Sequence, residues 1–187
     1  MKVKILNNHI QHIVTGFKQQ CHFYVKLLQM SQKLGKIVSE VSAKDDDDDG
    51  AVTGDITYKL NILPEQINEI MSERALIINN IARLEEDIRP HKEAVMNICH
   101  LKEFSLDRVQ DLINADLRKE FFEQIKLIQK IIKEIIEIDH VNEMALQKNM
   151  HNLAAELKKI KQHHQIQKTY LDRPEKFPES RFIDSKK

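Results

Sequence analysis

The stretch that decides the fold is residues 125–170, IKLIQKIIKEIIEIDHVNEMALQKNMHNLAAELKKIKQHHQIQKTY, which contains no Gly or Pro. In its first part, up to Ile138, Ile and Leu fall on more than one helical face, so this part is expected to be buried between two other helices. In the second part they narrow to a single seam, which leaves an apolar stripe without a partner. The sequence therefore predicts one long helix with a packed half and a binding half.

The composition favours long helices over a mixed sheet. The 187 residues include only four Gly, four Pro and no Trp, and 31% of them are charged. The 29 basic residues balance the 29 acidic ones, so no net positive field attracts nucleic acid or an anionic membrane, and the partners are expected to be proteins. No stretch approaches the roughly 20 apolar residues of a membrane span, and the start lacks a signal-peptide core, which predicts a cytoplasmic protein without membrane insertion.

Two further helices are predicted before the long one. Apolar residues from Ile10 to Val41 recur in steps of three and four, as in a coiled coil, although Gly16 and Gly35 lie among them. After Pro64, a second seam of the same period runs from Ile67 to Ile88, with Arg74 as its one charged member.

Breaks are predicted between the second helix and the last one. Pro90 disfavours helix at the residue before it, so the second helix should stop or kink there, with a looser helical stretch to about Phe104. A short helix over 105–113 is expected next. Asn114 is then available to cap the long helix.

The expected fold is all-α: an elongated antiparallel bundle or coiled coil of three long helices, with or without a short fourth. One domain is expected over residues 1–170, with an acidic loop at 43–63 and a disordered tail at 171–187, where two Pro occur and no period is visible. At about 1.5 Å per residue, the last helix reaches roughly 85 Å against roughly 57 Å for each of the others. The excess of about 25 Å should fall at the C-terminal end, where another copy, the loop or a client would have to cover the apolar stripe.

Motifs for catalysis or metal binding are incomplete. The acidic run 45–50 matches the first half of a calcium-binding EF-hand loop, but Ile56 stands where that loop needs a bidentate Glu. Glu137 and His140 have the spacing of one di-iron ligand pair, yet no second pair is present. No Gly-rich phosphate loop or nucleophile elbow occurs. The chain is therefore not expected to be an enzyme or to hold a metal or cofactor.

Two residues of the last helix each admit two interpretations. Asn142 is polar at a seam position, where such a residue either fixes the register of the helices or serves a function. Tyr170 either closes the apolar stripe or is an exposed aromatic anchor for the pocket of a partner.

The chain resembles the FlgN family of flagellar export chaperones. The resemblance rests on the order of three helices, which carry YVKLLQMSQKL at 24–34, ERALIINNIARLEEDIRP at 73–90, and the last helix quoted above. The family's last helix carries a D-x-x-N-x-x-x-L type segment, a long amphipathic stretch and then a Tyr; the matching residues here are Asp139, Asn142, Leu146 and Tyr170. The resemblance covers about Ile10 to Tyr170, and the Asp-rich loop and the tail depart from it.

The resemblance implies a cytoplasmic chaperone of flagellar type III export. Such a protein binds hook-associated, or hook–filament junction, proteins, prevents their premature assembly and delivers them to the cytoplasmic domain of the export gate. It implies that Tyr170 docks on the gate and that the client binds the amphipathic part of the last helix, at Asn142, Leu146, Met150, Leu153, Leu157 and Ile160. Two alternatives stay open: a structural coiled coil that self-associates, for example as a homodimer, and a related flagellar chaperone with a different client.

Overall fold

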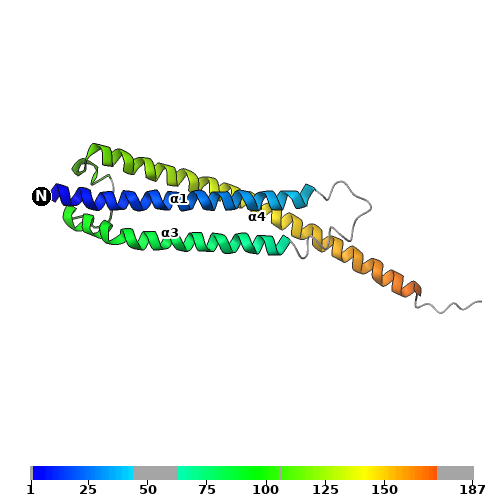
Figure 1. The fold of residues 1–187 in the computed structure, drawn as a ribbon. Helices are drawn as coiled ribbons and strands as arrows, with labels where there is room; N and C mark the ends of the chain where they lie inside the picture. The colour runs from blue at the N-terminus through cyan, green and yellow to red at the C-terminus, as the bar shows by residue number, and fades with distance from the viewer. Residues whose placement is uncertain (1, 44–62, 106, 172–187) are drawn as a thin grey trace, which may run out of the picture. The chain divides into compact units, whose positions relative to one another are not determined.

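Three long helices make up most of the chain, and no strand occurs in the part of it that the structure describes (Figure 1). This structure is a computed structural model, and it describes residues 2–43, 63–105 and 107–171. The helices are α1 (Lys2–Ala43), α3 (Leu63–Cys99) and α4 (Ala115–Leu171), with a short 3-10 helix, η3 (Gln110–Leu112), before α4. The predicted all-α class with three long helices is confirmed. The acidic run 45–50 and residues 172–187 of the predicted tail lie outside the described residues.

The chain divides into two units, Met1–Asn149 and Met150–Lys187, with the boundary inside α4. The single domain predicted over residues 1–170 stays a prediction. The longest helix is α4, with 57 residues against 42 in α1 and 37 in α3, as the sequence predicts. In the first unit, α4 packs with α1 and α3.

In the first unit, α1 and α4 run in the same direction and α3 runs antiparallel to both (Figure 1). Apolar clusters follow one another along this three-helix bundle. The cluster nearest the start of α1 includes Ile10 of α1, Val95 of α3 and Phe121 of α4. The ring of Phe121 lies edge-on to that of Phe17, with the two ring centroids 5.2 Å apart. Burial of such side chains at a period of three and four residues is what holds amphipathic helices together.

The middle of α4 packs against both other helices. Ile131 and Ile135 are buried in a cluster that includes Leu27 of α1 and Ile77 of α3, whereas Leu127 and Ile136 are exposed. The prediction that this Ile-rich block lies between two other helices agrees with these contacts. In a bundle of three helices, each helix has two neighbours and keeps one face in solvent.

Pro90 does not end the second helix. The structure assigns α3 as one α-helix through Pro90, and it ends at Cys99 rather than near Phe104. At its end His100 has the left-handed φ of 56°, and the amide of Leu101 donates a hydrogen bond to the carbonyl of Met96 at 2.9 Å. This is a Schellman ending, which usually uses Gly at the left-handed position.

The start of α4 follows the sequence prediction. Asn114 caps the helix, because its Oδ1 accepts a hydrogen bond from the amide of Asp116 at 2.8 Å. The short helix predicted over 105–113 is reduced to the single 3-10 turn η3. No helix within the described ranges is both long and apolar enough to cross a membrane.

Candidate functional site: the C-terminal part of helix α4

A polar layer crosses the bundle where the three seams meet. The guanidinium of Arg74 on α3 donates to both carboxylate oxygens of Asp139 on α4, at 3.2 Å and 2.5 Å, and also to the hydroxyl of Ser31 on α1. Ser31 is fully buried, and its hydroxyl donates to the carbonyl of Leu27 at 3.2 Å. The charged member of the second seam is thus paired inside the bundle, as a buried charge must be.

Two Asn residues of α4 fix its register against α1. Asn142 Nδ2 donates to the carbonyl of Ser31 at 2.8 Å, and Asn149 Nδ2 donates to the carbonyl of Val38 at 3.2 Å. Both donors and both acceptors are seven residues apart, so the same contact is made twice at the heptad spacing. A shift of α4 along α1 would break both hydrogen bonds together.

Asn142 and Leu146 therefore belong to the bundle. Only 4% of Asn142 is exposed, and Leu146 packs against a cluster that includes Leu34 and Ile70. Asn142 is bonded to α1 and Leu146 is partly buried against α1 and α3, so these contacts give both residues a structural role, and their binding of a client stays a prediction. The register interpretation of Asn142 accounts for its position.

The two glycines of α1 mark close approaches between helices. A Cβ on Gly35 would lie 2.7 Å from Asn142 Oδ1, and a Cβ on Gly16 would overlap the side chain of Ile88. Gly in a helix costs on the order of 1 kcal/mol relative to Ala, so both positions are explained by the space they leave for a neighbouring side chain.

The remaining predicted client-binding residues form what we call the C-terminal stripe: Met150, Leu153, Leu157 and Ile160. They recur in steps of three and four, the spacing of a coiled-coil seam. No side chain that the structure describes between Met150 and Lys168 is buried. Met150 is 70% exposed, and the other three members of the stripe are partly exposed.

Tyr170 lies in the last turn of α4. Its side chain is outside the described residues, so its role in docking stays a prediction.

Candidate metal ligands from the sequence do not come together. Glu137 and His140 are both exposed on α4, and Glu137 pairs with Lys133 at 3.8 Å. Among the residues with described positions, no three His, Cys, Asp or Glu side chains are grouped so that they could hold a metal ion. The calcium-like run 45–50 lies outside the described residues.

A cluster of three imidazoles, which no motif of the sequence predicts, joins α1 and α3. The Nδ1 atoms of His9 and His91 lie 3.0 Å apart, and the rings of His12 and His91 stack with centroids 4.5 Å apart. Burial lowers the pKa of His91, and the neighbouring His12 and His9 lower it further. The i, i+3 spacing of His9 and His12 predicts that they share a helix face, but only the antiparallel pairing with α3 brings His91 to them.

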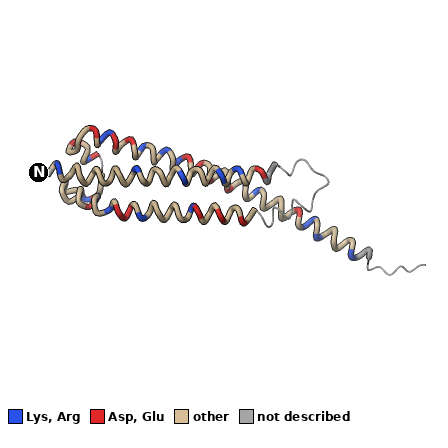
Figure 2. Tube along the Cα trace, viewed as in Figure 1, with Lys and Arg blue, Asp and Glu red and all other residues tan. Residues whose placement is uncertain are grey.

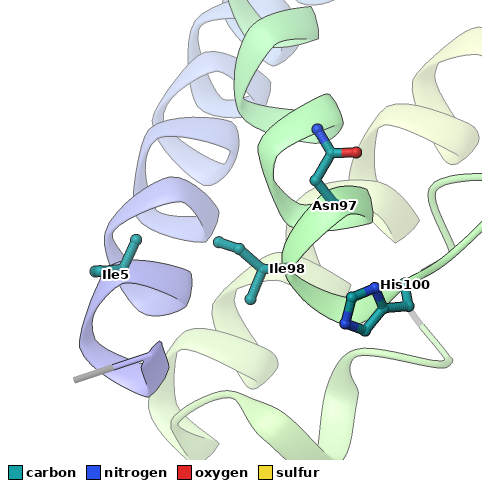
Figure 3. A pocket seen from close by; sticks show the side chains of 4 residues that line it. All are labelled: Ile5, Asn97, Ile98 and His100. Atoms are coloured by element: carbon teal, nitrogen blue, oxygen red, sulfur yellow. The ribbon is translucent and has the colours of Figure 1, made fainter.

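A small pocket lies near the start of α1 and the end of α3. It is lined by Ile5, Asn97, Ile98 and His100, and Figure 3 shows Ile98 of α3 pointing towards Ile5 of α1. The lining is mostly apolar and brings no set of acid, base and nucleophile together, so the pocket does not define an active site.

Comparison of the chain with models of protein families, with curated proteins and with solved structures gives no match.

Proposed function

We propose that the chain is a helix-binding chaperone whose C-terminal stripe takes up an amphipathic helix of a client protein. The single observation that carries the proposal is the contrast along α4. Up to Asn149 its seam includes buried residues, and from Met150 the same period continues to Ile160, yet no side chain described between Met150 and Lys168 is buried. An amphipathic helix laid along such a stripe gives the helix-in-groove type of recognition.

The chemistry of the stripe supports a helical partner. Leu153, Leu157 and Ile160 are spaced as a coiled-coil seam, and this narrow spacing suits one partner helix better than a broad apolar surface. Burial of apolar side chains contributes about 25 cal/mol per Å², so even a few such residues supply a useful part of a binding free energy.

The flagellar form of the proposal is supported by the resemblance to the FlgN family. In that form the client is the coiled-coil terminus of a hook-associated protein, the chain acts in the cytoplasm without catalysis, and it delivers the client to the export gate. Asp139 and Asn142, which match the family's D-x-x-N pattern, have a structural role in this chain, since both are bonded inside the bundle. The D-x-x-N pattern thus supports a helix arrangement like that of the FlgN family. The C-terminal stripe supports the binding of a client helix.

Calorimetry of the full chain with a peptide from the C-terminal helix of a hook-associated protein tests the proposal. Leu153→Asp/Leu157→Asp should abolish binding, because two carboxylates would be placed where apolar contacts form. The matched control is Ala155→Asp/Gln162→Asp, which adds the same charge at exposed positions outside the stripe and should leave the affinity within about threefold.

The remaining outcomes separate the alternatives. Unchanged affinity of the Leu153→Asp/Leu157→Asp variant would exclude this face as the client site. If sedimentation shows that the unliganded chain self-associates at micromolar concentration and the same variant is monomeric, the stripe serves a structural coiled coil instead. Binding of a different flagellar client, with no binding of the hook-associated peptide, would favour the related chaperone class.

A further inference from the structure

The residues that flank the C-terminal stripe carry an uneven charge. Met150 and Leu157 share one seam position of a heptad, and Leu153 and Ile160 share the other. One flank of this heptad carries Lys161, and Lys168 follows seven residues later on the same side, beyond the end of the stripe at Ile160. The opposite flank carries Glu156 and His163. Flanking positions of this kind set partner choice in coiled coils, because their side chains meet those of the partner helix.

The whole segment is basic, although the full chain is neutral. Between Met150 and Lys168 there are four Lys and one Glu, an excess of three positive charges with His neutral, while basic and acidic residues balance at 29 each over the 187 residues. Figure 2 shows both signs of charge along the three helices. Lys161 and Lys168 are exposed, and neither forms an ion pair with a carboxylate that the structure describes.

We infer that the occupant of the stripe is an acidic amphipathic helix, which presents carboxylates to Lys161 and Lys168. This inference rests on the proposed function and adds the charge of the partner to it. Opposite charges at flanking positions steer association and exclude helices that are basic there, so they would select one client among many with a similar apolar seam.

A second copy of the chain fits these flanks less well. A second copy offers only one flanking carboxylate, Glu156, to the two lysines of the first copy. If the two copies run antiparallel, the lysines of one copy lie opposite the lysines of the other, and like charges repel. An anionic membrane surface is also disfavoured. A membrane-surface helix needs a broad apolar face, often with Trp or Phe, whereas this segment has a narrow seam, contains no aromatic residue other than His up to Lys168, and has Glu156 at the edge of the stripe.

Two synthetic helical peptides test the inference with the full chain. Both carry the same Leu seam, and they differ only at the flanking positions, which are Glu in one and Lys in the other. At low ionic strength the Glu peptide should bind at least about tenfold more tightly than the Lys peptide, and added salt should reduce this ratio. The double variant Lys161→Glu/Lys168→Glu should reverse the order of the two affinities.

The control is Lys158→Glu/Lys159→Glu, which makes the same change of net charge at positions outside the flanks and should preserve the order. If both peptides bind equally and the flank variant changes nothing, the acidic partner is wrong while the helix-binding function stands. If neither peptide binds, the acidic partner and the helix-binding function are both wrong. Sedimentation with vesicles of phosphatidylglycerol should show no binding that depends on Lys161 and Lys168; such binding without binding of the peptides would assign the segment to a membrane instead.

Discussion

The carboxylate of Asp139 on α4 accepts two hydrogen bonds from the guanidinium of Arg74 on α3, at 3.2 Å and 2.5 Å. The Arg74 side chain is only 12% exposed, so this pairing neutralises a charge that is largely removed from water. The same guanidinium also donates to Ser31 on α1, and one ion pair therefore ties all three helices at a single level of the bundle.

Replacing one partner of this pair should be more harmful than replacing both. Asp139→Ala leaves the guanidinium without its counter-charge and should lower the free energy of unfolding by about 2–3 kcal/mol. Arg74→Met/Asp139→Ala should lose clearly less than the sum of the two single losses, as measured by urea denaturation. Additive losses would show that the pair is not coupled. The exposed pair of Lys130 and Glu134 is the control, where Glu134→Ala should cost about 0.5 kcal/mol or less.

Much of this fold can be predicted from the period of the apolar residues. The steps of three and four residues in the three seams predict three long helices, and the polar Asn114 predicts the cap of α4, because both signals are local to the chain. Of the two outcomes predicted at Pro90, the stop is wrong, since a Pro inside a helix removes one hydrogen bond that packing against neighbouring helices can offset. The kink stays a prediction.

The candidate site was predicted only in part, for a different reason. Asn142 and Leu146 continue into the C-terminal stripe without any change of period, so the sequence alone did not show that Asn142 is buried whereas no described side chain from Met150 to Lys168 is. The same limit applies to His91, which meets His9 and His12 only through the antiparallel pairing of α1 and α3. Contacts between residues distant in sequence leave no periodic signal.

Gly35 tests whether the hydrogen bond of Asn142 sets the spacing of α1 and α4. Gly35→Ala gains on the order of 1 kcal/mol in helix propensity, but its Cβ would displace the Asn142 amide from Ser31. We expect a net loss of stability by thermal denaturation. In an Asn142→Ala background the obstacle is gone, and Gly35→Ala should then be stabilising. Stabilisation in both backgrounds would contradict the close approach.

The imidazole cluster should make the bundle less stable in mild acid. The pKa of His91 in the folded chain is lowered from 6.5, chiefly by burial, so the unfolded chain binds more protons below that pH. Its contribution to stability is therefore complete above about pH 7 and is lost as the pH falls through 6.5 towards the folded pKa.

His91→Gln should reduce this pH dependence, measured as the free energy of unfolding at about pH 7.5 and about pH 5.5. The control His151→Gln changes an exposed residue of α4 and should leave the pH dependence of stability unchanged. An equal pH dependence in the wild type and the His91→Gln variant would contradict the role of the cluster.

A substitution of Tyr170 should distinguish client binding from delivery of the client to the export gate. If its ring is an anchor in a pocket of the export gate, Tyr170→Ala should lose about 2 kcal/mol of docking free energy, which is roughly thirtyfold in affinity. Client affinity should not change, since Tyr170 lies beyond the C-terminal stripe. Calorimetry of both complexes on one preparation tests this, with Thr169→Ala as the control. Unchanged gate binding, or an equal fall in client binding, would remove the delivery role.

The most direct measurement of the central claim is hydrogen exchange along α4 with and without the hook-associated peptide. Amides from Met150 to Lys168 should exchange more slowly in the complex, because a helix without buried side chains opens easily until a partner covers it. Amides of α1, of α3 and of α4 before Asn149 should keep their rates. Protection confined to Met150–Lys168 is the predicted result; protection of the bundle helices alone, or no protection of α4 at saturating peptide, would contradict the proposed function.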